Sequence, residues 1–293
     1  MRVVSLLPAA TEIVAALGAL GRLVGVSHEC DFPPEVRSLP RVTRTRIDPA
    51  MPSDAIDRAL AKAKGTGVSP VEVDVNLVAH LRPDVLIGQS LCDVCAVGEG
   101  ELAGLVTTLI PTPWVVTLHA HTLDEVFLDI RKVGEALELR DEAEELEAGL
   151  RYRLRRVGAQ AQRSGKVGAQ HAAPLRKPRV LVLEWVDPPY VAGHWVPELV
   201  ALAGGQDVGG APGEPSRPRP WDELVALAPD VVVVALCGFD IPRAQAELAA
   251  VTDRQARALL GRRVEFLDGN AYTSRPGPRL VDSAEMLTRL ILG

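Results

Sequence analysis

Short apolar runs alternate with amphipathic segments along almost the whole chain. Runs such as Val3–Leu7, Val85–Gln89 and Val231–Leu236 predict buried strands, because few polar residues interrupt them. The segments between them, such as Pro8–Leu17, repeat apolar residues at helical spacing. This alternation predicts an α/β fold with mainly parallel sheets. Further strands are predicted at Leu23–Ser27, Trp114–Leu118, Arg179–Glu184 and Val264–Leu267.

One pattern occurs twice. Leu77–Ile87 and Leu224–Val233 each read as an amphipathic helix, a Pro-Asp turn and an apolar strand, followed further along by Cys92 and Cys237 respectively. A chain of 293 residues is also long enough for two separate cores. We therefore expect two Rossmann-like lobes, each containing one copy of the pattern.

The middle of the chain predicts a long connecting helix. From Thr122 to Leu154 the apolar positions keep a helical period without proline, and at ~1.5 Å per residue such a helix would reach roughly 50 Å. Two helices broken near Glu138–Asp141 are the alternative. The polar stretch Gln160–Lys177 predicts a linker. The predicted domains are 1–121 (N-terminal lobe), 122–160 (connecting helix) and 161–293 (linker and C-terminal lobe).

The net charge and the lengths of the apolar runs limit the classes of partner and the location that we expect. The formal net charge is -6, which argues against nucleic acid as the main partner. No run approaches the roughly 20 apolar residues that span a membrane. Met1 leads directly into the first strand, without the pattern of a secretory leader. We therefore expect a cytoplasmic protein, or a periplasmic or extracytoplasmic one from which a leader has been removed.

The loops after the predicted strands contain the residues with the most distinctive chemistry. Ligands of open parallel sheets bind beyond the carboxyl ends of the strands. These loops hold all four cysteines, and Trp185, Tyr190 and Trp195 lie within eleven residues. Such aromatic side chains suit a large flat ligand, although Trp185 and Trp195 covering a sheet edge is the alternative. The predicted ligand-binding residues are Pro8, Ala9, Cys30, Asp31, Cys92, Cys95, Trp185, Tyr190, Trp195, Cys237, Phe239 and Tyr272.

The cysteines leave several interpretations open. Cys92 and Cys95 form a CxxC motif that Cys30 and His28 could join as metal ligands. Zinc binding, a thiol redox pair and contact between sulfur or imidazole and a cobalt ion are all compatible with these residue types. Reduced cysteines that line a cleft or pack beneath it are the structural alternative. His119 and His121 are predicted to be surface residues near a hinge.

The order of motifs resembles the periplasmic binding proteins that serve vitamin B12, siderophore and haem importers, and is most similar to their cobalamin-binding branch. The resemblance covers nearly the whole chain. It is carried by Val3–Glu12, Leu23–Ser27, Asp31–Pro34, Leu81–Ile87, Pro188–Gly193, Ala228–Val232 and Arg275–Leu280.

The resemblance implies two lobes joined by one long helix, a corrinoid ligand such as cobalamin between them, and no required cofactor. It also implies delivery to an ABC permease through acidic residues on each lobe. Candidates are Glu99 or Glu101 and Asp222 or Glu223, although the helix dipole explains acidic residues at helix starts equally well. The region Ile47–Val71 is longer than the pattern requires and predicts an extra flap.

The chain is predicted to be a binding protein and not an enzyme. It has no glycine-rich phosphate loop, no GxSxG elbow and no HExxH helix. A ferric siderophore, haem or a metal ion is an alternative ligand. An enzyme that uses metal or thiol chemistry at Cys30, Cys92, Cys95 and His28 is the alternative from another class.

Overall fold

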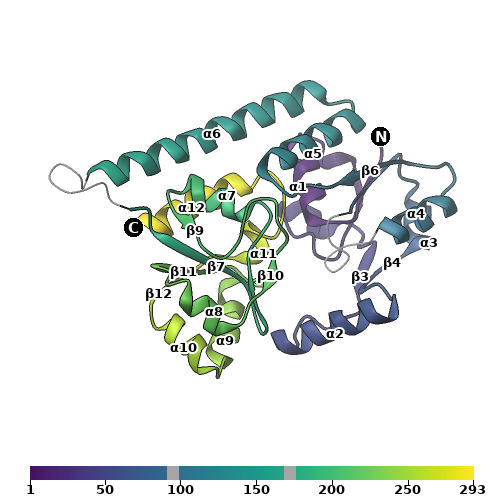
Figure 1. Cartoon of the computed structure of the whole chain (residues 1–293). Helices are drawn as coiled ribbons and strands as arrows, with labels where there is room; N and C mark the ends of the chain where they lie inside the picture. The colour runs from purple at the N-terminus through teal and green to yellow at the C-terminus, as the bar shows by residue number, and fades with distance from the viewer. Residues whose placement is uncertain (91–98, 168–175) are drawn as a thin grey trace. The chain divides into compact units, whose positions relative to one another are not determined.

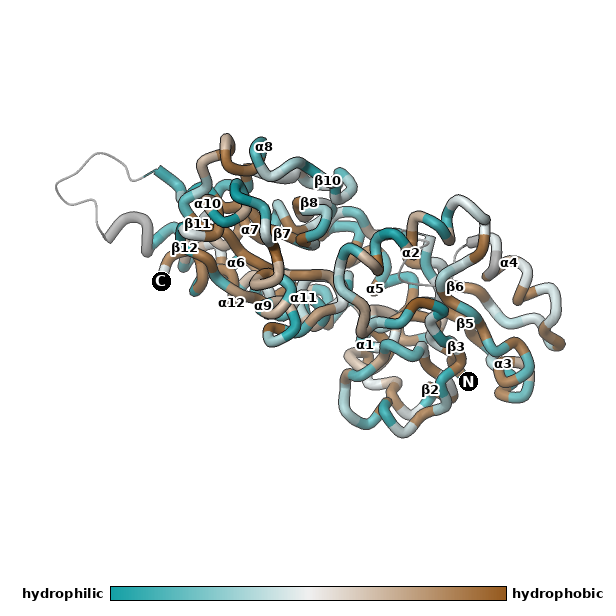
Figure 2. Tube along the Cα trace, turned by 90° about the horizontal axis from the view of Figure 1, so that it is seen from below, coloured by the Kyte–Doolittle hydropathy of each residue, from teal (hydrophilic) through white to brown (hydrophobic). Residues whose placement is uncertain are grey.

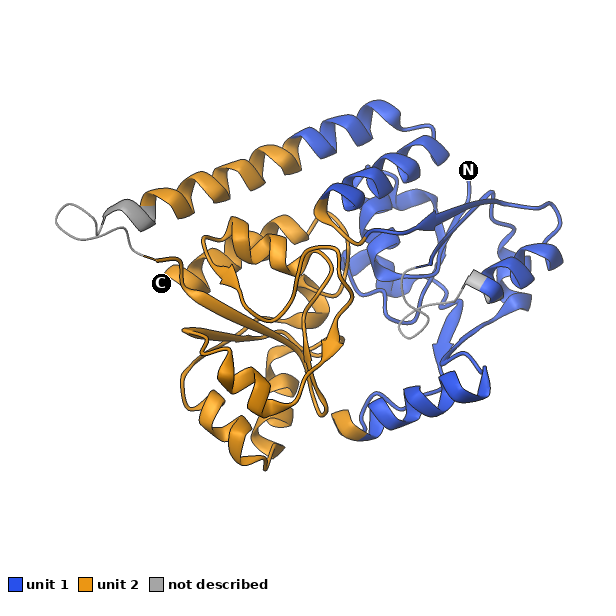
Figure 3. Cartoon of the chain, in the orientation of Figure 1, with its two compact units in different colours: residues 1–51, 55–120, 124–148 blue, residues 52–54, 121–123, 149–293 orange. Residues whose placement is uncertain are grey.

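The computed structural model describes residues 1–90, 99–167 and 176–293, which form two compact units (Figures 1 and 3). Unit 1 comprises residues 1–51, 55–120 and 124–148. Unit 2 comprises residues 52–54, 121–123 and 149–293. Each unit has its own sheet and its own helices, and none of the described helices is both long enough and apolar enough to cross a membrane.

Unit 1 is built on four parallel strands in the order β2-β1-β5-β6. The strand order reverses between β1 and β5, which is the point where open α/β sheets bind ligands. A separate antiparallel pair, β3 with β4, flanks the predicted flap Ile47–Val71, which contains helix α2. The strands are β1 (Val3–Ser5), β2 (Leu23–Val26), β3 (Thr43–Thr45), β4 (Val71–Val73), β5 (Val85–Gln89) and β6 (Trp114–Leu118). The helices are α1 (Pro8–Ala16), η1 (Leu20–Arg22), η2 (Pro34–Ser38), α2 (Ser53–Thr66), α3 (Val75–Leu81), α4 (Glu99–Thr108) and α5 (Leu123–Ala136).

Side chains on one face of the unit 1 sheet form a core with helices α3 and α4. Val4 and Leu86 belong to this core and are fully buried, and Leu102 and Leu105 of α4 are buried against them. The trace is hydrophobic along β5 in Figure 2. Burial of such side chains contributes about 1.5–3 kcal/mol each, which explains why short apolar runs become strands here.

Unit 2 repeats the same parallel order as β9-β7-β11-β12, and adds antiparallel strand β8 beside β7 and β10 beside β8. This topology confirms the predicted Rossmann-like α/β class with mainly parallel sheets. The strands are β7 (Arg179–Val186), β8 (Pro189–Val191), β9 (Gln206–Asp207), β10 (Arg217–Pro218), β11 (Val231–Val234) and β12 (Arg263–Phe266). The helices are α7 (Val196–Leu202), α8 (Trp221–Ala226), α9 (Ile241–Ala250), α10 (Arg254–Leu260), α11 (Gly269–Tyr272) and α12 (Leu280–Leu292).

The region predicted as one connecting helix contains two, in agreement with the alternative of a break near Glu138–Asp141. Helix α5 ends at Ala136, and α6 (Arg140–Val167) begins after a turn in which Glu138 has a left-handed φ of 57°. Leu137 in this turn is fully buried, so the apolar period continues through the break and does not by itself separate one helix from two. The long helix is α6, whose 28 residues start in unit 1 and end in unit 2. It also runs through residues 160–167, which were predicted as linker.

The predicted repeat is a structural one. In unit 1 the Asp84 carboxylate accepts a hydrogen bond from the Arg2 backbone N–H at 2.6 Å. In unit 2 the Asp230 carboxylate accepts one from the Arg179 N–H at 2.7 Å. Each aspartate thus ties its Pro-Asp turn to the start of the central strand of its own sheet. The residue before each Pro-Asp pair has left-handed backbone: Arg82 (φ 46°) and Ala228 (φ 45°).

Candidate functional site

The strand-tip edge of unit 1 carries a polar cluster after β2. The Thr43 hydroxyl lies 2.7 Å from His28 Nδ1 and donates to the Ser27 hydroxyl at 3.2 Å. Thr43 also accepts the His28 backbone N–H at 3.0 Å. The Arg41 guanidinium donates to the carbonyl oxygens of Ser27 and Cys30. Burial, and then the Arg41 charge, lower the pKa of the half-buried His28, so both disfavour the charged imidazolium.

Cys30 belongs to the interior of unit 1. Its side chain is 1% exposed, and its Sγ lies 3.1 Å from the Thr11 hydroxyl. Thr11 in turn donates to the Ser5 hydroxyl at 2.8 Å. This short hydrogen-bonded chain joins β1, α1 and the loop after β2. The packing agrees with the structural alternative for Cys30 more closely than with ligand contact.

The remaining predicted residues of this edge differ in exposure. Pro8 is half-buried at the first position of α1, and Ala9 is 2% exposed. Asp31 is partly exposed. Its neighbour Phe32 is 42% exposed, and the predicted ligand set did not include it. The signal for Phe32 in the sequence was an aromatic residue in the loop that follows a predicted strand.

The strand-tip edge of unit 2 is aromatic. Trp185 near the end of β7 pairs across the strands with Tyr190 of β8, and both side chains are partly exposed. The Trp185 ring lies 5.0 Å from the Phe239 ring, at an angle of 38°. The Arg243 guanidinium lies 5.1 Å from the centre of the Phe239 ring. The structure thus brings together three predicted ligand residues from β7, β8 and the loop after β11.

Trp195 has a different environment. It is 5% exposed, and its indole N–H donates to the Thr273 carbonyl oxygen at 2.9 Å. The ring therefore fixes the loop to the rest of unit 2, as the alternative of a sheet-covering tryptophan proposed. The sequence alone does not separate Trp195 from Trp185, since both lie in the same aromatic loop.

Two histidines meet beside this tryptophan, although the sequence predicted His121 only as a surface residue. The rings of His121 and His194 have centroids 5.5 Å apart. Burial, and then the proximity of His121, lower the pKa of His194. His194 has a left-handed φ of 52°, and its N–H donates to the Glu214 carbonyl oxygen. A Cβ at Gly193 would collide with that oxygen, so only glycine fits the approach.

Cys237 and Tyr272 complete the predicted residues of unit 2. Cys237 is half-buried after β11. Tyr272 ends α11 and lies under the Arg279 guanidinium, 4.7 Å from it. Both are partly exposed at the carboxyl-terminal side of the parallel strands, as predicted from the order of strands and loops.

The predicted metal site lies largely beyond the described part of the chain. Cys92 and Cys95 fall outside the described residues. Among residues 1–90, 99–167 and 176–293, no three His, Cys, Asp or Glu side chains gather to hold a metal ion.

The predicted permease-docking residues lie in the first turns of two helices. Glu99 and Glu101 are in the first turn of α4, with side chains outside the description. Asp222 and Glu223 are exposed in the first turn of α8, where Glu223 pairs with Arg219 at 3.2 Å. Their position allows both interpretations, docking and stabilisation of the helix dipole.

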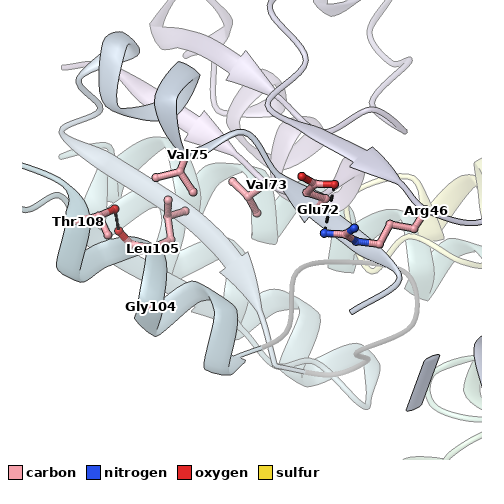
Figure 4. Close-up of a pocket in the computed structure, with 7 residues that line it drawn as sticks. All are labelled: Arg46, Glu72, Val73, Val75, Gly104, Leu105 and Thr108. Atoms are coloured by element: carbon pink, nitrogen blue, oxygen red, sulfur yellow. Dashed lines mark hydrogen bonds and ion pairs between the residues drawn. The ribbon is translucent and has the colours of Figure 1, made fainter. Parts of the chain in front are cut away.

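Two pockets lie inside single units, away from the predicted ligand residues. The unit 1 pocket has a volume of about 250 Å³ and is shown in Figure 4, with the Arg46–Glu72 ion pair at one end. The unit 2 pocket has a volume of about 480 Å³. Neither contains a predicted ligand residue. The first is lined by Arg46, Glu72, Val73, Val75, Gly104, Leu105 and Thr108, the second by Lys177, Pro197, Ala201, Gly205, Gln206, Asp207, Gly210 and Pro212.

Asp207 in the second pocket is an unusual carboxyl group. Its Oδ1 accepts the N–H groups of Gly209 and Gly210 at 2.8 and 2.9 Å, and its Oδ2 is buried with no hydrogen-bond partner among the described residues. Burial raises the pKa of Asp207 to about 6, although the two glycine N–H groups oppose this rise. The Asp207 carboxyl group therefore binds the turn at Gly209 and Gly210, and the free-energy cost of burying its charged form depends on pH.

Two α/β units with parallel sheets, joined by a long helix and carrying aromatic and polar residues at their strand tips, define a class of bilobed binding proteins. Residues 3–254 match the family described as "Periplasmic binding protein", and the chain belongs to that family. Membership of a family of binding proteins confirms both the resemblance found in the sequence and the expectation of a binding protein over an enzyme.

Individual relatives are distant but cover the whole chain. A vitamin B12-binding protein of Vibrio cholerae is 24% identical, covering 98% of this chain and 87% of its own. The solved periplasmic haem-binding protein of Roseiflexus has a TM-score of 0.71 at 24% identity, covering 99% and 97% of the two chains. The solved periplasmic vitamin B12-binding protein of Vibrio cholerae has a TM-score of 0.69 at 21% identity, covering 99% and 96%. These structural likenesses establish the fold.

Proposed function

We propose that this protein binds a corrinoid through residues at the strand-tip edges of its units and delivers it to a membrane permease. The observation that carries the proposal is the aromatic edge of unit 2, where Trp185 and Tyr190 are partly exposed and Phe239 supports the tryptophan ring. Rings held in place offer contact area to a flat macrocycle at a low entropic cost.

The polar edge of unit 1 supports the same ligand. A corrin ring carries amide side chains around an apolar macrocycle, so it needs hydrogen-bonding groups as well as stacking surfaces. The cluster of His28, Thr43 and Ser27 supplies imidazole and hydroxyl groups that are already held in place by hydrogen bonds. The 24% identity to a vitamin B12-binding protein over 98% of the chain favours a corrinoid as well.

Haem is the second candidate ligand. A solved haem-binding relative has a TM-score of 0.71, similar to the 0.69 of the vitamin B12-binding structure. Haem is also a flat metal chelate, and would use the same aromatic edge. It differs in its two carboxylates, which require cationic partners that the amides of a corrinoid do not need.

We further propose that the protein acts outside the cytoplasmic membrane, as the name of its family indicates, with an ABC permease as its partner. Asp222 and Glu223 on α8, and Glu99 or Glu101 on α4, are the proposed docking residues. Cell fractionation of the producing organism tests the location: recovery only with the cytoplasm would contradict it. Charge reversal at Asp222 and Glu223 should reduce uptake without changing ligand affinity.

The test of the binding function is a set of four calorimetric titrations of the ligand-free protein. Cyanocobalamin and hydroxocobalamin should bind with one site per chain, at least about tenfold more tightly than haem or a ferric siderophore, a difference of about 1.4 kcal/mol. Tighter binding of haem or the siderophore would overturn the corrinoid preference. Absence of saturable binding by all four would overturn the proposed function.

A further inference from the structure

The hydrogen bonds around His28 specify which of its ring nitrogens carries the proton. Thr43 has a single hydroxyl proton, and it donates this proton to the Ser27 hydroxyl. The 2.7 Å contact between the Thr43 hydroxyl and His28 Nδ1 therefore needs its proton from Nδ1. A neutral imidazole protonated at Nδ1 has its free lone pair on Nε2.

Nε2 has no competing role within unit 1. It takes part in no hydrogen bond with any residue in the described ranges, whereas Nδ1 and the backbone N–H of His28 are both bound to Thr43. The side chain is only half-buried, at the strand-tip edge that follows β2. A histidine with a purely structural role would usually satisfy both ring nitrogens.

The loop that carries His28 is fixed at both ends. The Cys30 N–H donates to the Ser27 carbonyl oxygen at 3.1 Å, which closes a tight turn around His28. Arg41 donates to the carbonyl oxygens of Ser27 and Cys30 at 3.0 and 2.6 Å. The imidazole is thus bound by the Thr43 side chain and stands on a loop that Arg41 fixes, so little conformational freedom is left to lose when a ligand binds.

We propose that His28 Nε2 is an axial ligand to the metal ion at the centre of the bound chelate. The inference rests on the proposed function, because it needs a macrocycle whose metal has an exchangeable axial position. A macrocycle already supplies four nitrogen ligands, so a single imidazole completes the contact and no cluster of three protein ligands is required. Thr43 acts as the positioning residue that sets the tautomer and the orientation of the ring.

The same structure argues against sulfur from Cys30 in this role. Its side chain is 1% exposed and its Sγ contacts the Thr11 hydroxyl, so it does not reach the surface that His28 occupies.

The ligand predicted to bind more tightly because of His28 is a corrinoid with water on cobalt, since imidazole replaces water readily. A corrinoid with cyanide on cobalt keeps its cyanide, so His28 adds less to its binding affinity.

The experiment compares hydroxocobalamin and cyanocobalamin binding to the wild-type chain, His28→Ala, Thr43→Val and the control His80→Ala, an exposed histidine on α3. Wild type and the control should shift the visible bands of hydroxocobalamin, as expected when imidazole replaces water. His28→Ala should abolish the shift and weaken hydroxocobalamin binding about tenfold, with less than about twofold change for cyanocobalamin. Thr43→Val should leave a weaker shift.

The outcomes separate this inference from the proposed function. Tight hydroxocobalamin binding with the same band shift in His28→Ala overturns the axial contact and leaves the binding function intact. A shift that survives in His28→Ala but disappears in Cys92→Ser or Cys95→Ser assigns the contact to sulfur, and also overturns it. If the wild-type chain binds neither corrinoid nor haem, the proposed function fails and this inference fails with it.

Discussion

The two units are alike at one end of their sheets and different at the other. Where the central strands begin, the Asp84 and Asp230 carboxylates each accept a hydrogen bond from the backbone N–H of an arginine. The side chains of these arginines, Arg2 and Arg179, each donate to the carbonyl oxygen two residues before the proline. At the strand tips, unit 1 presents hydroxyl and imidazole groups, whereas unit 2 presents aromatic rings.

This comparison separates what builds the fold from what recognises a ligand. The shared turns fix the register between a helix and its sheet, which every copy of the unit needs. The strand tips have no such constraint, because the backbone already leaves the sheet there. Chemistry can therefore diverge at the tips while the turns stay the same, and substitutions should affect stability at one end and affinity at the other.

The largest expected effect is an exception to that division. Trp195→Ala should lower the free energy of unfolding by about 3–5 kcal/mol, because the buried ring and its hydrogen bond to Thr273 are both lost. Trp195→Phe, which keeps most of the ring, should cost about 1–2 kcal/mol. Chemical denaturation measures both. Unchanged stability of Trp195→Ala would show that the ring does not anchor its loop.

The paired turns provide the next test. Asp230→Ala should lower the free energy of unfolding by about 2 kcal/mol, since Asp230 binds both the Arg179 N–H and the Arg176 guanidinium. Asp84→Ala should cost about 1 kcal/mol, because Asp84 is 57% exposed. Thermal and denaturant unfolding of the two variants compares them directly. An equal loss from both substitutions would mean that the Arg176 contact adds nothing.

Affinity should respond to the exposed tryptophan at the tips. Trp185→Ala should weaken cobalamin binding about tenfold, equivalent to about 1.4 kcal/mol, with little change in stability. Trp114→Ala is the matched control, since Trp114 is 55% exposed on β6 and is not a predicted ligand residue. Calorimetric titration that gives the two variants equal affinity would remove Trp185 from the binding edge.

The smallest expected effect is the pH dependence from Asp207. Its pKa of about 6 lies above its ordinary value of 3.8, so the folded state holds this proton more tightly than the unfolded state. Its contribution to stability therefore falls as pH rises from about 4 to about 6, then stays level. Asp207→Asn should gain on the order of 1 kcal/mol relative to wild type across that window. Denaturation at several pH values measures the difference, and a difference independent of pH would contradict the assignment.

The sequence predicted most of the fold and only part of the site, for physical reasons. Apolar strands such as β5 and β11 can be predicted from the sequence, because burial on both faces requires continuous apolar runs. The break before α6 was only an alternative in the sequence, because the buried Leu137 keeps the helical period through it. At the site, partners distant in sequence decide the roles: Thr273 lies 78 residues from Trp195, and Thr43 lies 15 residues from His28.

The edge strand β10 has a consequence for how copies of this protein meet one another. It consists of Arg217 and Pro218 only, and proline has no backbone N–H to donate. A strand from a neighbouring molecule therefore finds neither the length nor the donors to continue the unit 2 sheet on this side. This short edge protects the unit 2 sheet from self-association by strand addition at high protein concentration.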